Sequence, residues 1–216
     1  MEKEQNLGKY VSETTVNGLN PATLYERKAY AGGHFKLDIN SKDRPALPTR
    51  GFVMDLNIRP LLGINKESSN LMRTDIDMRV YASIFRLPRL VLASRLGWGK
   101  NWGSFEFPQA YYLGGTDNLR GYRRDRFGGR TRLFNNTEIR WKAAEFNTYL
   151  FPGTIGFLVF NDVGRVWQHG ETSSDWKVGN GVGVWVAPIN RFVIAAHLVR
   201  SKEEKGAPYV SFGFQF

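Results

Sequence analysis

Apolar and polar residues alternate through most of this chain, and the alternation is strictest in residues 72–84, MRTDIDMRVYASI. The even positions there are mostly apolar, as at Met72 and Ile76, whereas Asp75 and Arg79 occupy odd positions. A period of two places successive side chains on opposite faces of a β-strand. The pattern therefore predicts a strand with one apolar and one polar face.

Eight further segments show the same period, some of them less strictly. The predicted strands are 28–40, 52–60, 72–84, 89–98, 133–142, 154–167, 178–187, 191–200 and 208–216. All nine are capable of antiparallel pairing with their neighbours in sequence. We therefore predict an all-β fold, an antiparallel sheet of about eight to nine strands.

Strand length separates the two classes of protein that such a sheet could form. A soluble β-sandwich also alternates, because one face of each strand is buried and the other is solvated. Several predicted strands, however, reach about ten residues, the span of a tilted membrane strand, against about 5 to 6 in soluble sheets. Aromatic residues also lie near predicted strand ends, as the girdle of a membrane barrel requires: Trp98, Trp141, Trp167, Trp185 and Phe216. These features favour a transmembrane β-barrel.

The composition narrows the functional classes. Lys and Arg outnumber Asp and Glu by 30 to 20, which suits an anionic partner such as nucleic acid, phosphate or acidic lipid. No nucleic-acid recognition motif accompanies this charge, so nucleic acid is not expected as a partner. The chain has no Cys and only three His, far apart in sequence, so we expect no metal site and no cofactor. No Ser/His/Asp set has a recognisable spacing, so we expect no catalytic residue and no enzymatic activity.

Neither a membrane helix nor a secretory leader is visible in the sequence. No run approaches the roughly 18 to 20 apolar residues that a membrane helix needs. The start, MEKEQNLGKYVSE, lacks the cationic and apolar regions of a signal peptide. For a membrane barrel, this predicts a mature chain or a fragment.

One long segment, YYLGGTDNLRGYRRDRFGGR (111–130), interrupts the alternation with five Gly and five Arg. Gly disfavours both helix and strand, and no apolar period survives, so the segment is predicted to be an irregular loop. Irregular stretches of this length are uncommon in compact proteins unless they are functional or disordered. The loop is therefore the first candidate for a functional site.

Four motifs in order carry a resemblance to a known family: DRPALPTRG (43–51), NLRGY (118–122), FNDVGRVW (160–167) and the ending VSFGFQF (210–216). Together they resemble the superfamily of bacterial outer-membrane barrels that includes BamA, TamA and FhaC, the bacterial surface antigen type. The resemblance covers residues from about 28 to 216. It implies that the long loop folds back into the barrel lumen and docks its tip on the inner wall.

The resemblance and the strand parity together assign residues to this loop latch. Its tip would be Leu119, Arg120, Gly121 and Tyr122, and its partners on the wall would be Glu138 and Asp162, with Gly164 leaving room. A guanidinium removed from water needs carboxylate partners, and Arg can hold one of them through two hydrogen bonds. The ending resembles a C-terminal assembly signal read by the outer-membrane assembly machinery, carried by Phe212, Phe214 and Phe216.

The same parity assigns side chains to the two faces of the barrel. Lipid-facing residues are predicted to be Met72, Ile76, Met78, Leu92, Val184, Phe212 and Phe214, with Phe216 outward at the membrane boundary. Lumen-facing residues are predicted to be Asp75, Arg79, Glu138 and Asp162.

Barrels of this family have sixteen strands, so the nine strands predicted here would form the C-terminal half of such a barrel. The alternative is a small barrel closed from eight of the nine strands. Residues 1–25 are turn-rich and read as a loop or linker, and 26–216 as the barrel domain with a lumen-folding loop at 105–131.

The resemblance implies an integral protein of the bacterial outer membrane of a Gram-negative cell, acting in outer-membrane protein assembly or polypeptide translocation. Alternatives are a barrel that anchors an N-terminal enzyme domain, patatin-like or metallophosphoesterase, and a passive pore. Expected partners are outer-membrane lipid and lipopolysaccharide, and with them unfolded outer-membrane or secreted polypeptides and periplasmic accessory domains.

Overall fold

The computed structural model describes residues 27–216, except 85–88, 106, 150, 169–174 and 204. The predicted linker at 1–25 therefore lies outside the described residues. Ten strands form one antiparallel sheet: β1 (Tyr30–Gly32), β2 (Phe35–Asn40), β3 (Gly51–Gly63), β4 (Leu71–Ser83), β5 (Leu90–Gly103), β8 (Thr131–Asn147), β9 (Pro152–Trp167), β10 (Lys177–Pro188), β11 (Ile194–Ser201) and β12 (Lys205–Phe212). Among the described residues there is no helix of the length and apolarity needed to cross a membrane.

The sheet confirms the predicted all-β antiparallel fold. Its order is β1-β3-β4-β5-β8-β9-β10-β11-β12, with β2 also paired to β3. From β3 onward each strand of the sheet therefore pairs with the next strand of the sheet along the chain. The nine predicted segments correspond to these strands, the first being split at residues 33–34 into β1 and β2. The longest strands, β8 and β9, have 17 and 16 residues. Such lengths exceed those of ordinary soluble strands and suit a tilted span of a bilayer.

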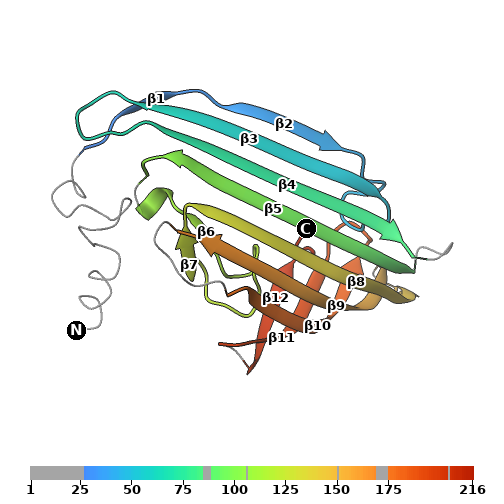
Figure 1. The fold of residues 1–216 in the computed structure, drawn as a ribbon. Coiled ribbons are helices and arrows are strands. Elements are labelled where there is room, and N and C mark those ends of the chain that lie inside the picture. Colours follow the sequence, from blue (N-terminus) through green and yellow to red (C-terminus); the bar gives the residue numbers. More distant parts are fainter. Residues whose placement is uncertain (1–26, 85–88, 106, 150, 169–174, 204) are drawn as a thin grey trace.

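The sheet curves into a trough, with β1 and β2 along one edge and β12 along the other (Figure 1). Within the described residues β12 pairs only with β11, and β1 and β2 pair only with β3, so the sheet is open. The small closed barrel considered as an alternative is therefore not what these residues form. The trough matches the other expectation, part of a larger barrel.

The two faces of the sheet differ as the alternation predicts. The convex face exposes apolar side chains, among them Met72, Leu92, Ile139, Phe157, Val184 and Phe212. The concave face carries polar and charged residues on β3, β4, β5 and β8. On β9–β11 it carries a buried apolar cluster that includes Leu158, Phe160 and Ala195. Trp185 was expected in the outer aromatic girdle but belongs to this concave cluster and is 4% exposed. The strict alternation of β10 places its side chain on the face opposite to that of Val184, which is exposed on the convex side.

The turn after β2 is closed by one carboxylate. Asp43 accepts hydrogen bonds from the backbone N–H of Thr49 at 2.8 Å and of Arg50 at 3.1 Å, and from the Thr49 hydroxyl at 2.6 Å. Partial burial raises the pKa of Asp43, but these hydrogen bonds outweigh it and hold the pKa below its usual value. The motif DRPALPTRG thus builds a defined turn, with Pro48 buried beneath it.

The end of the chain departs from the prediction. β12 ends at Phe212, which is paired to Ile194 and 86% exposed on the convex face. Gly213 then adopts φ 95°, a left-handed conformation that favours glycine, and turns the chain inward. Phe214 packs edge-on against Trp185 at 5.4 Å, and Phe216 lies 6.4 Å from Tyr81 of β4. The predictions that Phe214 faces lipid and that Phe216 points outward are therefore wrong.

Candidate functional site

The Gly/Arg loop between β5 and β8 lies against the concave face of the sheet. It contains a short 3-10 turn (Phe107–Gln109) and a two-stranded ribbon formed by β6 (Tyr111–Leu113) and β7 (Phe127–Gly129), so the prediction of a wholly irregular segment is wrong. Between β6 and β7 the chain continues to the tip at Leu119–Tyr122. Leu113, Leu119 and Tyr122 are buried together with Phe134 of β8. This apolar contact seats the loop on the wall.

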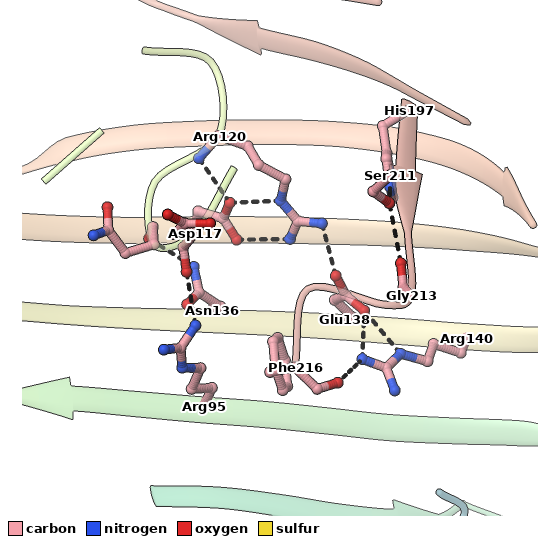
Figure 2. A network of polar contacts seen from close by, with 12 residues as sticks. Arg95, Asp117, Arg120, Asn136, Glu138, Arg140, His197, Ser211, Gly213 and Phe216 are labelled. Carbon is pink, nitrogen blue, oxygen red and sulfur yellow. Dashed lines mark hydrogen bonds and ion pairs between the residues drawn. The ribbon is translucent and has the colours of Figure 1, made fainter. Parts of the chain in front are cut away.

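Arg120 is the centre of the site (Figure 2). Its Nε donates to Asp162 Oδ2 at 2.7 Å, and a terminal nitrogen donates to Asp162 Oδ1 at 2.8 Å. The other terminal nitrogen donates to Glu138 Oε1 at 2.7 Å, and the Arg120 backbone N–H reaches Asp162 Oδ2 at 3.1 Å. The structure thus brings together the three charged residues that the sequence singled out.

These charges are removed from water. The Arg120 side chain is 2% exposed, and Glu138 and Asp162 are fully buried. A buried ion pair is tolerated only when good geometry and additional hydrogen bonds compensate for the desolvation of both charges. If one partner is removed, the other is left as a buried charge without a partner. The two-point contact between Arg120 and Asp162 meets that condition. Phe160 adds a further contact, because its ring lies 3.5 Å from the guanidinium carbon of Arg120.

Backbone contacts fix the loop on either side of Arg120. The side-chain amide of Asn136 donates to the Asn118 carbonyl at 2.9 Å, and Arg95 donates to the Asp117 carbonyl at 2.7 Å. Gly121 has φ 88°, in the left-handed region that glycine tolerates, and this turns the tip so that Tyr122 can reach the Val178 carbonyl at 3.2 Å. The tip is therefore held by several independent contacts to β5, β8 and β10.

Small residues on the wall make room for the tip. A Cβ on Gly164 would come within 3.0 Å of a Leu113 methyl group, as expected for a position that leaves space. Gly179 of β10, opposite Asp162 in the register, is more restrictive, because a Cβ there would lie 2.0 Å from the Arg120 carbonyl oxygen. Sequence reasoning missed both Gly179 and Phe160. Phe160 begins the FNDVGRVW motif and shares the parity of Asp162, which could have identified it.

A second arginine extends the network toward the end of the chain (Figure 2). Arg140 Nε donates to Glu138 Oε2 at 2.8 Å, and a terminal nitrogen donates to the Phe216 carbonyl at 3.0 Å. Its guanidinium carbon lies 3.9 Å from the Phe214 ring. Glu138 therefore joins two arginines, one in the loop tip and one beside the tail. Arg120, Arg140, Glu138 and Asp162 form a buried cluster with no net charge.

One pair beside the latch has part of the arrangement that a serine nucleophile requires. His197 Nε2 lies 3.1 Å from the Ser211 hydroxyl, but its Nδ1 has no hydrogen-bond partner among the described residues. A serine nucleophile needs a base that is itself oriented by a third group, and this pair lacks one within that part of the chain. The described ranges also contain no group of three or more side chains placed to hold a metal ion.

The Omp85 superfamily domain model matches residues 19–216. A solved structure, BamA from Haemophilus ducreyi lacking POTRA domains 1–3, aligns with a TM-score of 0.69 at 16% identity, covering 96% of this chain and 46% of that one. This chain thus spans less than half the length of that structure, and the likeness at this identity concerns the fold. No curated protein matches the chain. Because the family model covers nearly all the residues described, the chain belongs to the Omp85 superfamily.

Proposed function

We propose that this barrel region works in a machine of the bacterial outer membrane that inserts or translocates polypeptides, with no enzymatic activity of its own. Its substrates would be unfolded outer-membrane or secreted polypeptides, and its surroundings outer-membrane lipid and lipopolysaccharide. The matched H. ducreyi BamA structure lacks POTRA domains 1–3, and the present chain covers 46% of its length. We propose that the full-length form of the present protein works with periplasmic accessory domains of this kind.

The observation that carries the proposal is the buried latch. The loop tip buries Arg120 against two carboxylates, with every hydrogen bond between 2.7 and 3.1 Å. A loop docked on the inner wall would narrow an open pore, and a barrel that only anchors another domain does not require such a loop. A lumen filled by a latched loop suits a barrel whose interior must remain sealed while chains are handled at its wall.

The test is an assembly assay with the full-length protein and its accessory partners in liposomes. A urea-denatured outer-membrane protein is added, and its folding is followed by the change in its gel migration. Arg120→Ala should reduce the rate of assembly at least tenfold while leaving the barrel folded. Arg124→Ala is the matched control, because Arg124 lies in the same loop with its side chain 82% exposed, and it should retain the wild-type rate.

Two outcomes would contradict the proposal. If wild-type protein does not accelerate assembly above empty liposomes, the barrel is an anchor or a pore. If it conducts ions freely in planar bilayers and deletion of residues 111–130 leaves the conductance unchanged, the loop does not seal the lumen.

A further inference from the structure

A cavity of about 360 Å³ opens at the turn end of the trough, away from the latch. Three connections at this end contribute to its wall, through Arg44 and Pro48, Arg89, and Asn190, and the end of β8 adds Glu145. Arg140 and Lys142 of β8 enter from the concave face, and Trp185 and Phe214 form an aromatic side. The cavity is thus built by turns far apart in sequence, and its volume lies in the range of small-ligand sites.

The charge of this cavity is unbalanced. Four of its lining side chains are cationic and one is a carboxylate. One of the cations, Arg140, is already paired with Glu138 in the neutral cluster of the latch. The carboxylate, Glu145, is already bonded to Lys142. In the part of the chain that the structure describes, no ion pair is made by Arg44 or Arg89, and the terminal nitrogen Nη1 of the buried Arg140 has no hydrogen-bond partner.

Several arginines elsewhere on the concave face form ion pairs with carboxylates. Arg79 lies 2.8 Å from Asp77, Arg95 lies 2.6 Å from Asp77, and Arg132 lies 3.4 Å from Asp75. These three arginines are paired with carboxylates, whereas Arg44 and Arg89 at the turn-end cavity make no ion pair among the described residues. Uncompensated guanidinium groups around one cavity attract an anion from outside the chain.

We propose that this cavity is a binding site for a phosphate group carried on an apolar or aromatic body. Guanidinium groups bind phosphate oxygens through paired hydrogen bonds, and three of the four cations here are arginines. A doubly charged oxyanion matches the two charges of Arg44 and Arg89, which a single carboxylate does not. The aromatic pair, Trp185 and Phe214, offers a surface for the rest of the ligand, and the ligand's phosphate is either that of a soluble ester or that of a lipid headgroup.

The experiment measures binding of phenyl phosphate to the full-length protein in detergent by isothermal titration calorimetry at low ionic strength. Wild-type protein should bind it saturably, at one site. Arg44→Ala with Arg89→Ala removes two arginines that make no ion pair among the described residues, and should weaken binding at least tenfold, the usual consequence of losing a hydrogen bond to a charged group. Arg140 is left intact because it also contacts Glu138 in the latch network.

The matched control is Arg59→Ala with Arg124→Ala, which removes the same charge from exposed arginines outside the cavity. It should bind as wild type does. Equal weakening in both double variants would show only a general charge effect and would overturn the proposal, as would the absence of saturable binding by wild type. Heat-modifiable gel migration establishes that both variants are folded.

Two further arms identify the source of the phosphate. The titration is repeated in nanodiscs with and without phosphatidylglycerol. If the anionic lipid weakens phenyl phosphate binding by the wild type, the site takes a lipid headgroup; if it has no effect, the site takes a soluble ester. Benzoate, which has the same ring and a single charge, should bind at least tenfold more weakly than phenyl phosphate. Equal binding of the two would contradict the assignment to phosphate.

Discussion

At the scale of single residues, the site depends as much on what is absent from the wall as on the charges. Gly179 has no side chain, and the Arg120 carbonyl occupies the place where a Cβ would be. The charged contacts at Asp162 require that close approach, because Asp162 and Gly179 are opposite each other in neighbouring strands. A methyl group would therefore displace the loop tip without touching any charged residue.

Gly179→Ala should release the loop. The added Cβ would lie 2.0 Å from a backbone oxygen, which cannot rotate away, and overpacking of this kind costs about 1 to 3 kcal/mol. We expect faster proteolysis within residues 111–130 of the folded protein. Gly33→Ala is the control, because nothing lies within 4 Å of its Cβ position, and it should be cut at the wild-type rate. Equal rates in all three proteins would show that the tip does not rest on β10 in solution.

Arg120, Glu138 and Asp162 could be chosen from the sequence because motif and parity agreed, whereas Gly179 could not. The segment 178–187 alternates Gly with Val over much of its length, so no polar residue indicated which glycine meets the loop. Only the register of β9 against β10 places Gly179 beside Asp162. Partner strands in a sheet are aligned by pairing between distant parts of the chain, which the period of one strand does not reveal.

At the scale of whole elements, strict alternation predicted the long strands well. In β4 the predicted faces hold, because Met72 is exposed on the convex side while Asp75 is hydrogen-bonded by Tyr111 of the loop at 2.6 Å. The end of β12 shows where periodicity fails. Val210, Phe212, Phe214 and Phe216 continue one period, yet a single glycine conformation at Gly213 reverses the last part of it.

Cysteine labelling tests the two faces of β4. Ile76→Cys should react with a lipid-phase reagent in reconstituted protein, because Ile76 lies on the apolar convex face. Asp75→Cys, its immediate neighbour on the concave face, should react only with a water-soluble reagent. Because the two positions are at nearly the same depth in the membrane, a difference in their labelling cannot be explained by depth. Labelling of position 75 but not 76 from the lipid phase would mean that the faces are inverted.

Because the tail turns inward, we expect substitutions of Phe214 and Phe212 to differ in their cost to stability. Phe214→Ala should destabilise the protein in detergent by about 1.5 to 3 kcal/mol, because its ring packs on Trp185 and Arg140. Phe212→Ala removes the same ring from a position that is 86% exposed, and should cost much less there. Urea unfolding followed by tryptophan fluorescence provides both values. A larger loss of stability for Phe212→Ala than for Phe214→Ala would contradict the inward tail and would favour the outward tail that the alternation predicted.

At the scale of the whole molecule, two segments cross the interior of the trough. The loop tip reaches β8, β9 and β10, and the tail reaches from β12 back to Tyr81 on β4. Glu138 contacts an arginine beside each of them. The concave face is thereby organised around one buried carboxylate, and the central claim is that the loop and the wall are held together by the contact of Arg120 with Asp162 and Glu138.

A double-mutant cycle on Arg120 and Asp162 tests that claim most directly. Arg120→Ala, Asp162→Ala and the double variant are compared with wild type in the full-length protein, by the rate of proteolysis within residues 111–130. Each single change should cost about 3 to 5 kcal/mol of loop docking, because it leaves an opposite charge buried without its partner. The double variant should be little worse than either single one, a coupling that contacting residues show. Additive effects would contradict the account, and the arginine-rich loop would then be a surface feature rather than a latch.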